Sequence, residues 1–309
     1  MKILVTGGTG MVGSGFRGIT TEHEFILVGS KEHDLTSWHD TQLMMMRYKP
    51  DAVIHLAARV GGVKGNTDFV ADFYHQNAMI NTNVLQASKV FGAKKVVSLL
   101  STCVYPDKVN YPLTEDQIHN GPPHASNFGY AYSKRMLDVQ SRALRQQYGC
   151  NFICAIPNNL YGPHDNFDLE NGHVIPAIIR KIWEAKNGGS PPVFWSDGTA
   201  LREFTYAPDL AHILVHLLEK YNDPEPVNIG ITRERSIASV VDLVCKNLEY
   251  AGKIVWDVTK PAGQFKKPSN NDKLIATGWS NDGYTEFGDG LKSTCDWFKK
   301  NYPNLRGMK

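Results

Sequence analysis

A glycine-rich turn near the start of the chain constrains the fold more than any other feature. Gly7, Gly10 and Gly13 follow the apolar run Ile3–Thr6 directly, at three-residue spacing, and open a segment that we expect to be helical. In a strand–turn–helix unit the first glycine permits a tight turn, the second lets the backbone approach a pyrophosphate, and the third lets helix and sheet pack closely. Free amides at the helix start face the anion. The sequence therefore predicts a dinucleotide site at Gly7-Gly8-Thr9-Gly10-Met11-Val12-Gly13.

The first half of the chain alternates short apolar runs with longer stretches typical of helices. This alternation indicates βαβ units, and continuous apolar runs fit strands that are covered on both faces. We predict an α/β fold, a Rossmann-type doubly wound parallel sheet. The expected strands are Ile3–Thr6, Phe25–Val28, Ala52–Leu56, Lys95–Leu99 and Asn151–Ile156.

The alternation ends near Pro157, where segments rich in Pro, Gly and Asn begin. We predict a cofactor-binding domain at 1–156 and a mainly substrate-binding α/β lobe at 157–309, with an interleaved boundary. Ligands of such folds bind where the parts meet. The later helices are expected near 173–187, 208–220, 236–250 and 289–300.

The overall charge argues against nucleic acid or membrane surfaces as partners. The 33 basic and 31 acidic residues leave a formal charge of only +2, so any anionic ligand must be held locally. The five cysteines are odd in number and scattered, which favours free thiols in a reducing compartment. We recognise no targeting segment and no apolar run of the ~20 residues that span a bilayer, and therefore expect a cytoplasmic protein.

The end of the second expected strand, Val28-Gly29-Ser30-Lys31, bears on the cofactor. It has no carboxylate at the position where NAD-binding proteins hold the ribose 2′-hydroxyl, whereas Ser30 and Lys31 suit a 2′-phosphate. We expect NADP(H) rather than NAD(H).

A tyrosine and a lysine form a candidate proton-transfer pair. Tyr130 and Lys134 are one helical turn apart and so project from one helix face. A tyrosine is a poor acid at neutral pH, and a nearby ammonium favours its phenolate. Ser101 follows the strand near Leu99, at the end that faces the ligand in an open α/β sheet, where its hydroxyl suits a carbonyl oxygen.

With these motifs the chain resembles the extended short-chain dehydrogenase/reductase family. The resemblance rests on Gly7-x-x-Gly10-x-x-Gly13, the segment Asp51–Ala58, Ser101 and Tyr130-x-x-x-Lys134. Members bind nicotinamide nucleotides and rework sugars carried on nucleoside diphosphates. The resemblance implies Tyr130 as acid–base, Lys134 as the cation that tunes it and contacts the ribose, and Ser101 as the carbonyl binder.

Cys103 and His173 have no place in that general triad. Cys103 follows Ser101 by two residues, so in extended backbone both side chains share a face. His173 is expected in a loop that opens a helix of the second lobe. A 4-keto sugar has acidified hydrogens at C3 and C5, and inversion needs a base on one face and an acid on the other. A thiol and an imidazole titrate close enough to neutrality to exchange these roles.

Two longer strings narrow the resemblance, Pro157–Phe167 and His173–Ala177. They are similar to the epimerase-reductases of the family, which convert GDP-4-keto-6-deoxy-D-mannose by 3,5-epimerisation and NADPH-dependent reduction at C4. The similarity implies Cys103 and His173 as the epimerisation pair and a homodimer through helices near 70–91 and 129–148. It also implies cofactor contacts at Pro157, Asn158, Asn159, Leu160, Lys134 and His173, and substrate contacts at Lys181, Trp195 and Arg202.

One position departs from that pattern, and several alternatives stay open. Ala262 stands where the family often has an acid that contacts the nucleotide. A nucleotide-sugar 4-epimerase would leave Cys103 and His173 without a task, and a 4,6-dehydratase would need acidic residues directly after the serine. A non-catalytic NADP sensor typically loses the tyrosine or the lysine. The sequence decides neither the order of the two epimerisations nor the consequence of Ala262.

Overall fold

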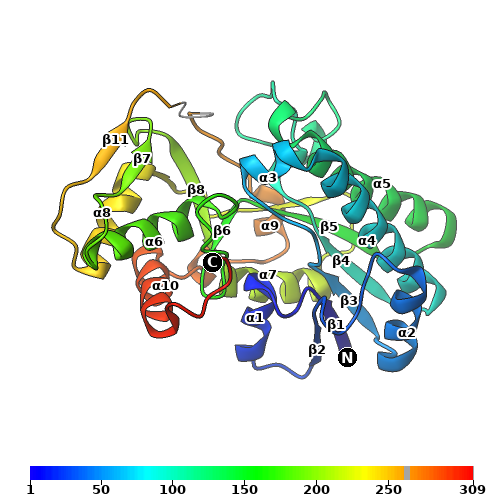
Figure 1. The fold of residues 1–309 in the computed structure, drawn as a ribbon. Coiled ribbons are helices and arrows are strands. Elements are labelled where there is room, and N and C mark those ends of the chain that lie inside the picture. Colours follow the sequence, from blue (N-terminus) through cyan, green and yellow to red (C-terminus); the bar gives the residue numbers. More distant parts are fainter. Residues whose placement is uncertain (261–264, 309) are drawn as a thin grey trace.

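A parallel sheet forms the centre of the molecule in the computed structural model, which describes residues 1–260 and 265–308. Its six strands run in the order β2-β1-β3-β4-β5-β9, and every neighbouring pair is parallel (Figure 1). The five strands expected from the sequence are confirmed to within two residues at each end. The bounds are β1 Lys2–Thr6, β2 Glu24–Val28, β3 Ala52–His55, β4 Lys95–Leu99, β5 Phe152–Pro157 and β9 Val227–Ile229.

Helices cover both faces of this sheet, as a doubly wound fold requires. Ile3 and Val5 of β1 point to one face and join the apolar cluster formed with α1 (Met11–Gly15) and α7 (Ala207–Lys220). Leu4, between them, points to the other face, where α2 (Trp38–Tyr48), α4 (Val70–Val90) and α5 (Phe128–Tyr148) pack (Figure 1). The predicted Rossmann-type sheet is confirmed.

The strand order reverses between β1 and β3. The chain leaves β1 for β2 on one side and then crosses to β3 on the other. Ligands of open α/β sheets bind outside the carboxyl ends of strands at such a point. The glycine turn after β1 and the segment after β3 therefore flank the predicted dinucleotide site.

A second, smaller unit lies beside the sheet (Figure 1). It contains a three-stranded sheet, a two-stranded sheet and helices α6, α8 and α10 around their own apolar core. Helix α7 and strand β9 follow residue 157 in the chain and nevertheless pack in the first unit. The remaining bounds are β6 Asn159–Tyr161, β7 Val193–Trp195, β8 Leu201–Tyr206, β10 Glu234–Ser236, β11 Val255–Asp257, α3 Val63–Asp68, α6 Val174–Lys186, α8 Ile237–Leu248, α9 Asp272–Ala276 and α10 Phe287–Asn301.

None of the helices in the described ranges combines the length with the apolar character that a membrane span requires.

Candidate functional site

The glycine turn has the geometry that its spacing predicted. Gly7 has a φ of +69°, which favours glycine, and Gly10 begins helix α1 without a side-chain cap. A Cβ at Gly13 would lie 2.4 Å from the Cα of Gly8, so helix and turn pack too closely for a side chain. A Cβ at Gly10 would have only the Gly7 oxygen, at 3.2 Å, within 4 Å among the described atoms. Gly10 thus presents open backbone, the feature a pyrophosphate needs.

The end of β2 carries a carboxylate that the sequence interpretation overlooked. Ser30 and Lys31 are exposed, as a 2′-phosphate contact requires. Glu32 follows them, and its Oε2 accepts a hydrogen bond of 2.8 Å from the Gly29 amide. Its carboxylate therefore closes the turn in which it lies.

Tyr130 and Lys134 lie on the first turns of α5, on the same helix face. The Lys134 Nζ is 5.8 Å from the centre of the Tyr130 ring and donates a hydrogen bond of 2.7 Å to the carbonyl oxygen of Leu99, at the end of β4. This bond joins the helix to the strand that precedes Ser101. The three members of the predicted triad are therefore set by two adjacent elements.

Burial shifts both Tyr130 and Lys134 away from their charged forms in the protein chain by itself. Burial raises the pKa of Tyr130, and the neighbouring Cys103 raises it further. Burial also lowers the pKa of Lys134, to about 8. The reason is that desolvation disfavours the charged form of each group. The chain holds Tyr130 as a neutral phenol, the form that can donate a proton.

The backbone after Ser101 is not extended, contrary to our expectation. Ser101 itself is extended, but Thr102–Val104 form a 3-10 turn. The Arg135 side chain of α5 holds this turn, because its Nε donates to the Val104 oxygen at 2.7 Å. The Ser101 side chain still forms a hydrogen bond with Cys103. The two side chains meet because the chain turns, and not because they alternate along a strand.

Cys103 lies within a group of interacting charges. Burial raises the pKa of its thiol, whereas the hydrogen bond with Ser101 and the cations Lys267 and Lys134 oppose that rise. Lys267 is a residue that the sequence interpretation did not select. It comes from the far end of the chain, and burial lowers its pKa while Cys103 opposes this change.

His173 caps the start of α6 on a loop held by hydrogen bonds. Asp168 Oδ1 accepts from the backbone amides of Glu170 and Asn171, at 2.9 and 2.7 Å. The Asn171 oxygen accepts from the Gly62 amide of the first unit at 2.9 Å. His173 itself keeps accessible surface. The protein around it is nevertheless dense enough that burial lowers the pKa of its imidazole, and nearby Arg306 lowers that pKa further.

The predicted nicotinamide turn, Pro157–Leu160, joins β5 to β6. Asn158 is buried, and its backbone amide donates a hydrogen bond of 3.0 Å to the backbone oxygen of Ile229. The Asn159 side chain donates to the backbone oxygen of Glu203 at 2.9 Å. Strands β8 and β9, much later in the sequence, therefore fix this turn.

Two of the predicted substrate residues, Lys181 and Trp195, lie close together in the second unit. The Lys181 Nζ donates to the Val193 oxygen at 2.8 Å and lies 5.5 Å from the centre of the Phe194 ring, and burial lowers its pKa. Trp195 is the last residue of β7, the strand that also contains Val193 and Phe194, and 63 % of its surface is exposed. Trp195 thus offers an exposed flat face to a ligand, on the strand whose Val193 oxygen holds the Lys181 ammonium.

The third, Arg202, lies on β8 near the first unit. Burial lowers the pKa of its guanidinium, while Tyr111, from the first unit, opposes this change. Its Nη1 donates to the carbonyl oxygens of Leu201 and Phe265, at 2.6 and 3.4 Å. Ala262 lies outside the described residues. No cluster of His, Cys, Asp or Glu suited to a metal occurs in the part of the chain that the structure describes.

Comparison with known proteins shows the family. Residues 3–230 match the model of the NAD dependent epimerase/dehydratase family. The chain belongs to this family.

Similar members of the epimerase/dehydratase family cover nearly the whole chain. The GDP-L-fucose synthase of Dictyostelium discoideum is 42 % identical, with 98 % of this chain and 97 % of the relative covered. A probable GDP-L-fucose synthase of Drosophila melanogaster is 39 % identical, with 99 % of each covered. The crystal structure of a GDP-L-fucose synthetase from Naegleria fowleri bound to NADP has a TM-score of 0.93 at 39 % identity, with 99 % of this chain and 94 % of that chain covered.

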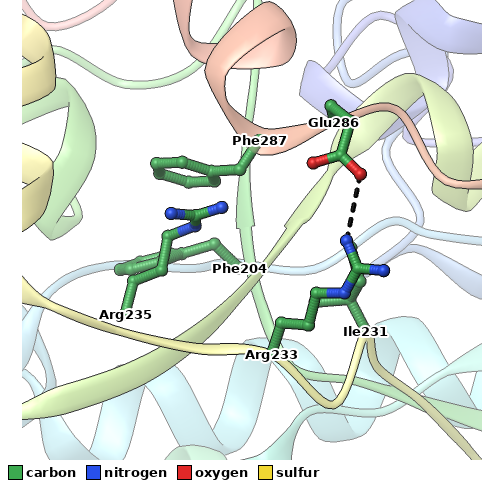
Figure 2. A pocket seen from close by; sticks show the side chains of 6 residues that line it. All are labelled: Phe204, Ile231, Arg233, Arg235, Glu286 and Phe287. Atoms are coloured by element: carbon green, nitrogen blue, oxygen red, sulfur yellow. Dashed lines mark hydrogen bonds and ion pairs between the residues drawn. The ribbon is translucent and has the colours of Figure 1, made fainter.

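A small pocket lies where β8, the segment that leads into β10, and the start of α10 meet (Figure 2). It is lined by Phe204, Ile231, Arg233, Arg235, Glu286 and Phe287. The Arg235 guanidinium stands 4.6 Å from the centre of the Phe287 ring, and Arg233 forms an ion pair of 3.0 Å with Glu286. These contacts hold β10 and α10 together. Since β10 pairs with β8, they support the strand that carries Arg202.

Proposed function

We propose that this chain converts GDP-4-keto-6-deoxy-D-mannose to GDP-L-fucose, by epimerisation at C3 and C5 and NADPH-dependent reduction at C4. The observation that carries the proposal is the thiol of Cys103, hydrogen-bonded to Ser101 and close enough to Tyr130 and Lys134 to alter their pKa values. A simple reductase has no use for a second acid–base group beside its triad. The GDP-L-fucose synthases that cover nearly the whole chain support the same substrate.

In the epimerisation, Ser101 and Tyr130 donate hydrogen bonds to the C4 carbonyl oxygen, which stabilises the enolate formed when C3 or C5 loses its proton. Cys103 and His173 serve as base and acid. The lowered pKa of His173 keeps its imidazole neutral near pH 7, ready to accept a proton. Cys103 needs Lys134 and Lys267 for its thiolate, because burial alone favours the thiol.

In the reduction, Tyr130 donates its proton to the C4 oxygen, and NADPH, when bound, would supply the hydride for C4. Its raised pKa ensures that it carries this proton. The Lys134 ammonium stabilises the phenolate left behind.

NADPH fits the residues that are present. The open backbone at Gly10 suits the pyrophosphate, and the exposed Ser30 and Lys31 suit a 2′-phosphate. The Glu32 carboxylate is bonded to the Gly29 amide, so it is not free to select a ribose hydroxyl. Thr9, Met11 and Val12 complete the turn, and Lys134, His173 and Pro157–Leu160 are the residues that would hold the nicotinamide ribose and ring.

The diphosphate and base of the substrate bind in the second unit. Lys181, Trp195 and Arg202 are the proposed contacts, and Lys267 supplies a further cation between Arg202 and Cys103.

Incubation of the purified enzyme with GDP-4-keto-6-deoxy-D-mannose and either NADPH or NADH, followed by identification of the product, tests the proposal. We expect GDP-L-fucose, formed faster with NADPH. A 4-reduced product with unchanged C3 and C5 would leave a reductase without epimerase activity, and no turnover of this substrate would refute the proposal.

The enzyme acts as a cytoplasmic homodimer through α4 and α5. Tyr74 and Val139 on these helices are 42 % and 56 % exposed, beside Phe128, which is 53 % exposed. The groove next to them is lined by Thr82, His119, Tyr132, Arg135, Met136, Val139 and Gln140. Such exposed apolar area typically marks a protein interface. Val139→Glu should shift the protein from dimer to monomer in sedimentation analysis, and a monomeric parent protein would contradict the assignment.

A further inference from the structure

Glu203 is a buried carboxylate on β8 that takes no part in the reaction steps proposed above. Only 2 % of its surface is exposed. Its Oε2 accepts hydrogen bonds from the Ser269 hydroxyl at 2.7 Å and from the Asn158 side-chain amide at 3.3 Å, and its Oε1 accepts from the Ser269 amide at 3.3 Å. It therefore connects the nicotinamide turn with the segment that follows Lys267.

The surroundings leave this carboxylate little freedom. A Cβ at Gly230 would lie 3.0 Å from Glu203 Oε2 and 2.5 Å from the Ser269 hydroxyl, so the backbone directly after β9 packs against the cluster. Ser269 is itself buried and forms a bridge with Leu113 of the first unit. The Asn159 side chain also donates a hydrogen bond to the backbone oxygen of Glu203. Every neighbour named here belongs to a different segment of the chain.

An ionised carboxylate accepts hydrogen bonds and donates none. Glu203 can therefore hold Asn158 and Ser269 at once, because both present N–H or O–H groups. Burial raises the pKa of Glu203, whereas these three hydrogen bonds oppose the rise. A buried charge is expensive unless it is fully hydrogen-bonded, so a role in holding the cluster explains its presence better than a role in stability.

We propose that Glu203 is a positioning residue, whose carboxylate joins Asn158 to Ser269 and thereby fixes Lys267, two residues away, relative to the nicotinamide turn. Lys267 is one of two cations that act on Cys103, so the hydrogen-bond network sets the nicotinamide turn and the surroundings of the epimerisation thiol together. The inference deepens the proposed function and rests on it for the role of that turn.

Glu203→Gln tests the link with little change of shape. The glutamine oxygen can accept from both the Ser269 hydroxyl and the Asn158 side chain, as Oε2 does, but the –NH2 group then faces the Ser269 amide, and that hydrogen bond is lost. Loss of one net hydrogen bond predicts an NADPH Kd raised about three- to tenfold. A displaced Lys267 also predicts that the pH midpoint of Cys103 alkylation by iodoacetamide rises by roughly half a unit. Peptide mass spectrometry of the substrate-free enzyme reads this midpoint at Cys103 alone.

Reciprocal exchange separates positioning from general stability. In Glu203→Gln/Asn158→Asp the new carboxylate accepts from the glutamine amide, and the glutamine oxygen still accepts from Ser269. We expect both the Kd and the alkylation midpoint to return most of the way to the parent values. The single variant Asn158→Asp places two carboxylates next to each other. We expect its NADPH Kd and its alkylation midpoint to exceed those of Glu203→Gln and of the double variant.

The matched control is Glu115→Gln, which alters another buried carboxylate, bonded to the Asn228 amide at 2.8 Å. It should lower the melting temperature and leave the Kd and the midpoint unchanged. Equal shifts in the control, or no recovery in the double variant, would overturn the positioning role. The alkylation measurement needs no substrate, so it stands even if the parent enzyme fails to make GDP-L-fucose.

Discussion

Methyl groups at Gly13 and at Gly10 should damage the protein in different ways. A Cβ at Gly13 would lie 2.4 Å from the Cα and 2.5 Å from the carbonyl carbon of Gly8, and 2.6 Å from the Gly7 oxygen. These are backbone atoms, which no side-chain rotation moves aside. Overpacking of this kind costs about 1–3 kcal/mol or more. For a chain of this size, we expect Gly13→Ala to lower the melting temperature by roughly 2–5 °C.

Gly10→Ala should leave the fold intact. The added Cβ meets the Gly7 oxygen at a tight 3.2 Å, and the φ of −83° suits alanine, which restricts the unfolded chain more than glycine does. These small effects oppose each other, so the melting temperature should change by less than about 2 °C. The methyl group nevertheless stands on the backbone that a pyrophosphate must approach. We expect the NADPH Kd to rise by about tenfold or more, a loss of about 1.4 kcal/mol.

Circular dichroism of the cofactor-free variants and fluorescence titration with NADPH separate the two effects. The matched pair differs by three positions in one turn, so expression or purity cannot mimic the pattern. Normal NADPH binding by Gly10→Ala would show that the pyrophosphate lies elsewhere. Unchanged melting of Gly13→Ala would refute the packing argument.

Three further outcomes concern the chemistry. Tyr130→Phe should slow NADPH oxidation by about two orders of magnitude or more, while solvent deuterium still enters C3 and C5 by NMR; near-normal oxidation would remove Tyr130 from its role. Cys103→Ser and His173→Gln should each block that deuterium exchange, because serine is too weak an acid and glutamine does not titrate; full exchange in both would make them packing residues. The reduction rate should fall as pH rises through about 8, because Lys134 is an ammonium below its lowered pKa and a neutral amine above it; a rate maintained up to the ordinary lysine pKa would contradict this.

Local patterns predicted the central sheet well. The strands from β1 to β5 are continuous apolar runs, and helices α4 and α5 are long segments between such runs, so composition and length identify them. Strand β9 was not foreseen, because three residues carry no recognisable pattern and join the sheet only through pairing with β5. The placement of α7 against α1 depends on the same return of the chain.

Spacing also found the residues that share one element. Tyr130 and Lys134 lie one turn apart, and Ser101 follows a strand that sequence identifies. The conformation at Cys103 was wrong because Arg135, from α5, stabilises a 3-10 turn there. No pattern in the sequence from Ser101 to Tyr105 indicates that tertiary contact with Arg135.

Residues that act through distant neighbours escaped the sequence interpretation. Lys267 stands in a basic pair that looks like solvated surface, and Glu203 follows Arg202 in a strand where a charge suggests exposure. Only the folded chain shows that Glu203 is buried against Ser269 and Asn158. The raised pKa of Tyr130 could not be foreseen for a related reason, because the amount of desolvation is a property of the whole fold.

The two proposed reactions draw on the same charges. Cys103 opposes the drop in the pKa of Lys134 caused by burial, and Lys134 in turn favours the thiolate of Cys103. Each ion therefore makes the other more likely to be present at a given pH, as linkage requires. When the thiolate takes a proton from the sugar, it loses the negative charge that stabilises the Lys134 ammonium. The Tyr130 phenolate needs that ammonium after the reduction. Because Lys267 acts on the same thiol, epimerisation and reduction must be treated as one coupled proton system rather than as two adjacent sites.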